Sequence, residues 1–135
     1  MKVHEVMTTD NLLSAGAGDS LAAAAHRMSW TPCRHLPVVK DGAVVGVLSE
    51  RDILAWIGAN HRLDGPGDVV GAAMAAPPAI ATPDEDIGEA AARMLSRRVG
   101  CLPVVTNGRL VGMLTRTDLL GKIVADMYTP TLDRG

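Results

Sequence analysis

An internal repeat constrains the fold of this chain more than any other feature. Residues 20–54 align without a gap with residues 86–120, and 14 of the 35 aligned positions carry the same residue. The likeness extends upstream, with one extra residue in the first copy. Each copy is about 55–60 residues long, which is short for a chain that must bury its own core. We therefore expect two packed repeats, at residues 1–62 and 68–130, on either side of a polar, turn-rich linker around 58–67.

Within each copy the sequence predicts a short strand, a helix, a β-hairpin and a second helix. Apolar residues recur at helical spacing in 21–28 and again in 87–94. Two apolar runs then flank Asp41-Gly42 in the first copy and Asn107-Gly108 in the second. These dipeptides are typical of type I′ hairpin turns, because both central residues of such a turn need a positive φ. The order indicates an α/β (α+β) fold.

Composition and charge argue against several partners. The net charge is −2 with no basic block, and Trp30, Trp56 and Tyr128 are the only aromatic residues. Nucleic acid is therefore a poor partner. No apolar run approaches the roughly 18 residues of a membrane span, and the N-terminus lacks the apolar core of a signal peptide. With two cysteines and no disulfide framework, we expect a cytoplasmic protein with reduced thiols and no membrane partner.

One pattern bears on chemistry and occurs at the end of the second hairpin strand in both copies. A hydroxyl residue is followed three positions later by an aspartate, as Ser49 and Asp52, and as Thr115 and Asp118. Helices should begin from about these aspartates, and a helix start offers free N–H groups to a phosphate. The aspartate can accept hydrogen bonds from both hydroxyls of a ribose.

Two interpretations of this pattern remain open. Arg51 and Arg116 lie nearby and could pair with a phosphate. The same hydroxyl and carboxylate spacing is also an ordinary capping box, which needs no ligand. The recurrence of the pattern in both copies, after the same Leu-Pro-Val-Val run, favours a binding role.

The duplicated order of motifs resembles the CBS domain, named after cystathionine β-synthase, in the tandem arrangement called a Bateman module. The resemblance rests on residues 6–8, 36–39 and 46–52, and on Met74, 102–105 and 112–118. It implies two strand-helix-strand-strand-helix repeats that pack sheet to sheet with pseudo-two-fold symmetry and leave two clefts. Members bind AMP, ADP or ATP, and less often S-adenosylmethionine or NAD(H). Such pairs often form a homodimer, a flat disc of four repeats.

In the family, the hydroxyl residue contacts phosphate, the aspartate contacts ribose, and the strands flank the adenine. Carried over, the resemblance assigns to the first cleft Leu13, Leu36, Pro37, Ser49 and Asp52, and to the second Ile80, Leu102, Pro103, Thr115 and Asp118. The second copy departs from the family pattern because Met74 is followed by Ala75, which has no hydroxyl. The first copy departs from it because Gly16 stands where the family usually has a proline, whereas the second copy has this proline as Pro83. His35 and Cys101 also differ at equivalent rim positions, so the two clefts should differ.

Other chemistries find less support. No P-loop, dinucleotide fingerprint or paired carboxylates are present, so we expect no enzyme and no catalytic residue. Cys33 and His35 lack further ligands at regular spacing, so we expect no metal. The expected function is an adenine-nucleotide sensor or regulatory module that acts on an unidentified protein or on its own oligomer. The alternative is a dimeric scaffold protein whose clefts stay empty.

Overall fold

Both hairpins that the dipeptide turns predict are present in the computed structural model, which describes residues 1–31 and 33–128. In the first repeat β2 (His35–Lys40) pairs with β3 (Ala43–Ser49), and in the second β4 (Cys101–Thr106) pairs with β5 (Arg109–Thr115). Both residues of each turn have a positive φ: 52° and 81° in the first, 52° and 82° in the second. The type I′ prediction is confirmed, and the two hairpins share one register.

The remaining elements also follow the predicted order. The first repeat contains η1 (Val3–Glu5), β1 (Ala15–Gly16), α1 (Leu21–Met28) and α2 (Glu50–Asn60); the second contains α3 (Val70–Ala73), α4 (Ile87–Arg97) and α5 (Arg116–Tyr128). The helices α2 and α5 begin two residues earlier than expected, because Ser49 and Thr115 themselves accept the first capping bonds. No helix in the described part of the chain is long and apolar enough to cross a membrane.

The short strand of the second repeat is reduced to a single bridge. Ala15 pairs in parallel with Val38, whereas Ala81 forms an isolated parallel bridge with Val104. Since Val38 and Val104 are equivalent, Ala15 corresponds to Ala81, and Ile80 therefore corresponds to Ser14. Leu13 and Ile80, assigned above to the same role in the two clefts, are therefore not equivalent, and this assignment is wrong by one residue, because the extra residue of the first repeat lies upstream of Ser14.

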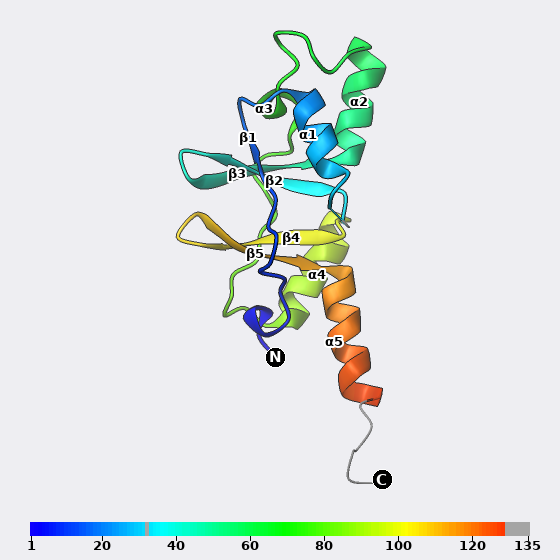
Figure 1. Ribbon diagram of the computed structural model, residues 1–135. Coiled ribbons are helices and arrows are strands. Elements are labelled where there is room, and N and C mark those ends of the chain that lie inside the picture. Colours follow the sequence, from blue (N-terminus) through cyan, green and yellow to red (C-terminus); the bar gives the residue numbers. More distant parts are fainter. Residues whose placement is uncertain (32, 129–135) are drawn as a thin grey trace.

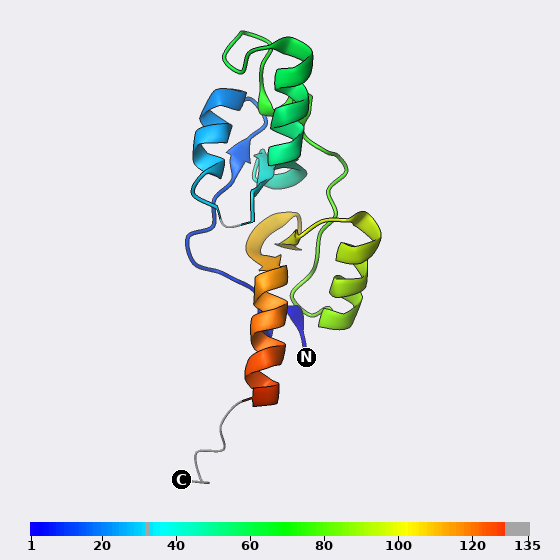
Figure 2. The ribbon, with the colours of Figure 1, turned by 90° about the vertical axis from the view of Figure 1, so that its right-hand side faces the viewer.

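The two repeats pack through their sheets. Figure 1 shows the hairpins side by side in the middle of the molecule, with α1 and α2 above them and α4 and α5 below. The turned view in Figure 2 keeps the same order of layers. At the hairpin tips the Val44 amide donates a hydrogen bond of 2.8 Å to the Gly108 carbonyl. The predicted fold, two repeats stacked with pseudo-two-fold symmetry, is confirmed.

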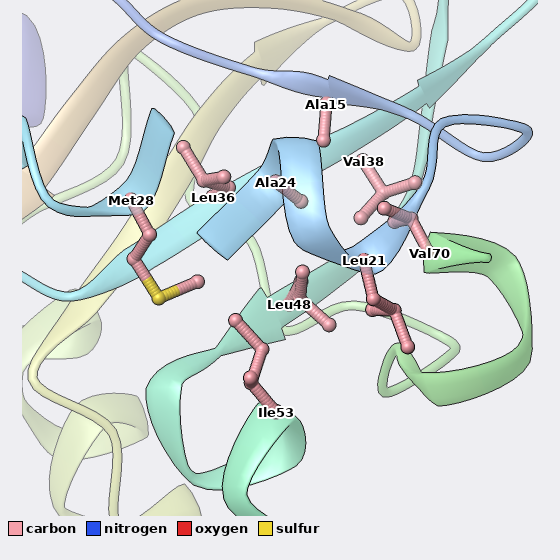
Figure 3. Close-up of a cluster of buried hydrophobic side chains, with 9 residues drawn as sticks. All are labelled: Ala15, Leu21, Ala24, Met28, Leu36, Val38, Leu48, Ile53 and Val70. Carbon is pink, nitrogen blue, oxygen red and sulfur yellow. The ribbon is translucent and has the colours of Figure 1, made fainter. Parts of the chain in front are cut away.

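Each repeat nevertheless lacks part of its own core. The first core gathers side chains from β1, α1, β2, β3 and α2, and it is completed by Val70 of α3, which follows the linker (Figure 3). The second core is completed by Val3, from the extreme N-terminus. Both valines are fully buried, and burying one such side chain stabilises a fold by about 1.5–3 kcal/mol. The leading segment of each repeat, which is its first stretch of chain, thus completes the core of the other repeat. The leading segments are exchanged, and each packed unit contains residues from both repeats.

Glycines at the centres of β3 and β5 allow this exchange. Thr8 exchanges two backbone hydrogen bonds of 2.8 and 2.9 Å with Met113, and Ala75 does the same with Val47. A Cβ on Gly112 would lie 3.1 Å from the Thr8 carbonyl oxygen, and one on Gly46 would lie 2.8 Å from the Ala75 carbonyl oxygen. The incoming segment therefore approaches the hairpin more closely than a side chain would permit.

The linker is folded against the first repeat around one buried carboxylate. Asp68 is 1% exposed and accepts hydrogen bonds from Trp56 Nε1 at 2.9 Å, Arg62 Nε at 2.8 Å and the Gly65 amide at 2.8 Å. Burial alone would raise the pKa of Asp68, but these three donors outweigh it and lower the pKa below its usual value. Asp68 thereby fixes the chain just before Val70 enters the first core.

We predict that Gly46→Ala destabilises the protein by about 1–3 kcal/mol, because the new methyl group must push the Ala75 backbone away. Thermal melts followed by circular dichroism measure the effect. The control is Gly58→Ala inside α2, where nothing lies within 4 Å, and this change should stabilise by roughly 0.5–1 kcal/mol. Equal melting temperatures for Gly46→Ala and the unchanged protein would contradict the role given to the glycine.

Candidate functional site

Both hydroxyl and aspartate pairs form reciprocal capping boxes. Ser49 Oγ accepts a hydrogen bond from the Asp52 amide at 3.1 Å, and Asp52 Oδ2 accepts one from the Ser49 amide at 2.8 Å. Thr115 and Asp118 make the same two bonds at 3.0 Å each. The structural interpretation of the pattern is therefore confirmed, and it places both side chains at the N-terminus of a helix. There the exposed N–H groups and the helix dipole favour an anion.

The two hydroxyl and aspartate pairs differ in the hydrogen bond to the carboxylate oxygen that the capping box does not use. Thr8 Oγ1 donates a hydrogen bond of 2.9 Å to Asp118 Oδ1, across 110 positions of sequence. The corresponding residue beside Asp52 is Ala75, which has no hydroxyl to donate. The expected loss of a hydroxyl contact at Ala75 is therefore confirmed, and the two clefts are chemically different.

A cavity of about 560 Å³, which we call cavity 1, lies beside Thr115 and Asp118. Its wall comes from both repeats: the N-terminal segment, the loop before β2, and the start of α5. The lining residues are Thr8, Asp10, Asn11, Leu12, Leu13, Trp30, Thr31, Cys33, Arg34, His35, Pro37, Gly100, Met113, Thr115, Arg116, Thr117 and Asp118. This volume is within the range of small-molecule sites, roughly 300–1,000 Å³.

A second, more open hollow of about 1000 Å³, cavity 2, lies between the starts of α2 and α5 and the end of α4. Five arginines line it: Arg34, Arg51, Arg97, Arg98 and Arg116. Arg34 forms an ion pair of 2.6 Å with Glu50, whereas Arg116, at the position equivalent to Glu50, forms none of the ion pairs seen among the described residues. Cavities 1 and 2 share Arg34, His35, Gly100 and Arg116, so Arg116 borders both.

The grouping of residues into clefts by repeat is wrong. Leu13 and Pro37 of the first repeat line the same cavity as Thr115 and Asp118 of the second, and not one with Ser49 and Asp52. The exchange of leading segments carries residues 1–8 onto the second hairpin and 70–75 onto the first, so residues 10–13 leave the second hairpin beside Thr115 and Asp118. Pro37 belongs to β2 and reaches the same cavity where the two repeats pack. Each strand-to-helix corner consequently faces the N-terminal segment of the other repeat.

The other predicted residues lie around these cavities or in the cores. Ser49 and Arg51 line cavity 2, and Asp52 lines neither cavity. Leu36 and Leu102 point into the two cores and are fully buried, because successive strand residues alternate between faces. Pro103 is fully buried as well, and the Ile80 carbonyl accepts a hydrogen bond from Arg93 at 2.9 Å. A binding role for these residues stays a prediction.

Several lining residues were not foreseen. Thr8 could have been found, since the hydroxyl after Met7 was the feature that the second repeat lacks. Trp30 and Arg34 lie in the loop before β2, where the two repeats share no identical residue, so the duplication carried no signal. We expected no metal because the remaining cysteine and histidines show no regular ligand spacing in the sequence, whereas the structure brings Cys101 beside Cys33 and His35.

The three sulfur and nitrogen side chains affect one another's protonation. A hydrogen bond from the Cys101 thiol, together with His35, lowers the pKa of Cys33 to about 5. The same hydrogen bond and burial raise the pKa of Cys101. The bond with Cys33 also raises the pKa of His35. The pKa values of the two cysteines therefore shift in opposite directions, downward for Cys33 and upward for the buried Cys101.

Comparison with known proteins agrees with this architecture. A family model of the CBS domain matches residues 3–59 and again residues 67–125. The crystal structure of CBSX2 in complex with AMP superposes with a TM-score of 0.81 at 28% identity, covering 93% of this chain and 98% of that one. An uncharacterized conserved protein from Pyrococcus horikoshii gives a TM-score of 0.79 at 25% identity, covering 91% of this chain and 54% of that one.

A curated relative is longer than this chain. The uncharacterized 33.4 kDa protein in the ribosomal RNA operon of Thermofilum pendens is 26% identical over 132 residues. The match covers 91% of this chain and 44% of that protein. This chain thus spans less than half of that relative.

We predict that Thr8→Val destabilises the protein by about 0.5–1.5 kcal/mol, because the isosteric side chain no longer donates to Asp118. Thermal or urea unfolding measures the difference. The matched control is Thr9→Val at the exposed neighbouring position, where the change should alter stability by less than about 0.5 kcal/mol. If both valine variants unfold alike, the hydrogen bond to Asp118 contributes nothing measurable.

Proposed function

The chain belongs to the CBS domain family, and from that premise we propose that it is a regulatory module that binds an adenine nucleotide in cavity 1. The single observation that carries the proposal is the composition of the cavity 1 wall. Apolar side chains that include Leu13 and Trp30 line the same cavity as the polar side chains of Thr115 and Asp118. A planar apolar base and a hydroxylated, charged sugar phosphate need both kinds of environment in one pocket.

The proposed orientation follows from charge. The Asp118 carboxylate accepts from the ribose hydroxyls, in the place where it now accepts from Thr8. The phosphate lies toward the N-terminus of α5 and Arg116, which combines free amides, a helix dipole and a guanidinium. Additional phosphates extend toward cavity 2, with its five arginines. AMP, ADP and ATP are accordingly the first candidates, and S-adenosylmethionine and NAD(H) follow from the family resemblance.

Regulation follows from the position of the cavity between repeats. A ligand in cavity 1 touches the loop before β2 in one repeat and the start of α5 in the other. Binding therefore favours those arrangements of the two repeats that keep both contacts, and shifts the population toward them. The proposed output is read by a protein partner or by the chain's own oligomer, in the cytoplasm and without catalysis. The proposal is supported by the AMP that CBSX2 binds.

We predict that one adenine nucleotide raises the melting temperature, and that Asp118→Ala abolishes this shift whereas Asp52→Ala keeps it. The test compares AMP, ADP, ATP, S-adenosylmethionine and NADH by thermal melts and confirms binding by calorimetry. At about 100 times the dissociation constant, a ligand adds roughly 2.7 kcal/mol of stability. Asp52→Ala is a matched control because both aspartates make the same capping bonds.

The outcomes separate the candidate functions. A shift lost in Asp118→Ala alone supports cavity 1 as the site. A shift lost only in Asp52→Ala would move the site to the other corner. No shift with any ligand would overturn the nucleotide proposal and leave the scaffold function.

We also propose that a second copy of the chain covers the outer faces of α2 and α5. Apolar side chains are exposed along both helices, including Leu54 at 62%, Leu120 at 63% and Met127 at 68%. Figure 1 places these helices on one side of the molecule, away from the hairpin tips. Exposed apolar side chains on two helices along one side of a molecule are typical of a protein interface. The homodimer accounts for it.

Sedimentation equilibrium tests the dimer. We predict a mass of twice the 14.1 kDa of one chain, and a return to 14.1 kDa in the double variant Leu120→Glu with Met127→Glu. Charged side chains at a buried interface lose hydration without a partner, which opposes association. The control is Lys40→Glu at the end of β2, on the hairpin side, which should remain dimeric. A monomeric unchanged protein at micromolar concentration would refute this assembly.

A further inference from the structure

A cluster of soft ligand atoms lies where the two repeats meet. One ligand atom each from Cys33, His35 and Cys101 lies within 4.8 Å of the others. Cys33 comes from the loop before β2, His35 from the start of β2, and Cys101 from the start of β4. His35 and Cys101 are equivalent positions of the duplication, so the pseudo-two-fold axis brings them together. Cys33 and His35 line cavity 1, but the nucleotide contacts proposed above are made by other side chains.

The histidine is held in a definite orientation. His35 Nδ1 lies 2.6 Å from the Cys33 carbonyl oxygen. Because a carbonyl oxygen only accepts, Nδ1 carries the proton, and the neutral ring keeps its lone pair on Nε2. Histidines that ligate metals commonly donate their other ring N–H to a backbone carbonyl in this way.

The cluster is also shielded while remaining reachable. Cys101 is 3% exposed, and Cys33 and His35 are partly buried and line cavity 1. Neither cysteine forms a disulfide. Both sulfur atoms are therefore available as metal ligands, which bind in the thiolate form. Two thiolates and one imidazole form a ligand set that zinc prefers in proteins.

We propose that Cys33, His35 and Cys101 form a Zn²⁺ site between the two repeats, with the fourth coordination position open to cavity 1. Bond lengths of about 2.3 Å to sulfur and 2.0–2.1 Å to nitrogen place tetrahedral ligand atoms roughly 3.5–3.8 Å apart. The three ligand atoms lie up to 4.8 Å apart, and side-chain movements of about 1 Å would bring them into this geometry. Each cysteine binds as a thiolate and releases its thiol proton to solvent, and a water molecule completes the tetrahedron.

The site has a structural consequence of its own. Zinc bound to Cys101 and to the Cys33–His35 pair would link the two repeats directly, beside the wall of cavity 1. This inference rests on the packing of the repeats and not on nucleotide binding, because it uses nucleotide-free protein. Its failure would leave the proposed function intact, and the failure of nucleotide binding would leave the metal site intact.

The experiment uses the full chain, purified with a chelator and reductant and then freed of both. Titration with Co²⁺ reports thiolate ligation through an intense sulfur-to-cobalt absorption band, and Zn²⁺ should displace this band at one ion per chain. Competition with a chromophoric chelator then gives the zinc affinity. We expect Cys33→Ser, Cys101→Ser and His35→Gln each to weaken zinc binding by more than the roughly 10- to 100-fold typical of second-shell changes.

Controls keep the result independent of folding. His4→Gln changes an exposed histidine outside the cluster and should leave the cobalt spectrum unaltered. Circular dichroism checks each variant, and Cys33→Ser, at the partly exposed position, is decisive if Cys101→Ser does not fold. Less than one ion per chain, a cobalt spectrum without the sulfur band, or full affinity in folded Cys33→Ser would overturn the proposal. A Cys33–Cys101 disulfide that persists in reductant-free buffer while zinc is present would also overturn it.

Discussion

Everything in this molecule depends on the exchange of two short segments between the repeats. Without Val70 the first core is incomplete, and without Val3 the second is incomplete. The backbone pairing of Thr8 with Met113 and of Ala75 with Val47 attaches each segment to the opposite hairpin, and the glycines of β3 and β5 make room for it. Because each half is too small to bury a sufficient core alone, the exchange makes the two repeats one cooperative unit. The same exchange assembles cavity 1 from both halves.

At the corner between β5 and α5 the same side chains cap a helix and line a cavity. Thr115 and Asp118 cap α5 through their reciprocal bonds, and both residues line cavity 1. The cap uses Asp118 Oδ2, so Oδ1 stays directed at Thr8 and at the cavity. A preorganised carboxylate of this kind loses little conformational entropy when a ligand binds. The equivalent corner at Ser49 and Asp52 keeps its cap but lacks the threonine partner.

Local patterns predicted most of the fold, and contacts between repeats set the limits of that prediction. The turns at Asp41-Gly42 and Asn107-Gly108 and the caps at Ser49 and Thr115 follow from neighbours in sequence, and they are present in the structure. The grouping of Leu13 and Pro37 with Asp118 depends on which repeat the N-terminal segment joins, and no periodicity encodes that choice. The closeness of Cys33 to Cys101 likewise arises only when the two halves pack. Trp30, Trp56 and Tyr128 are the only aromatic residues, so the composition already implies cores of aliphatic residues, whichever half completes which core.

The pseudo-two-fold axis has one further consequence, at the starts of β2 and β4. A residue far from the axis has its counterpart on the other side of the molecule, so a substitution in one repeat leaves the other site unchanged. A residue near the axis lies next to the equivalent residue of the other repeat. One position of the repeat therefore provides both side chains of a contact. Divergence of a single position, to histidine in one copy and cysteine in the other, therefore creates a mixed pair at the junction. Near the pseudo-two-fold axis, duplication of one residue places two side chains next to each other. Later substitutions in either copy then decide what chemistry the pair can perform.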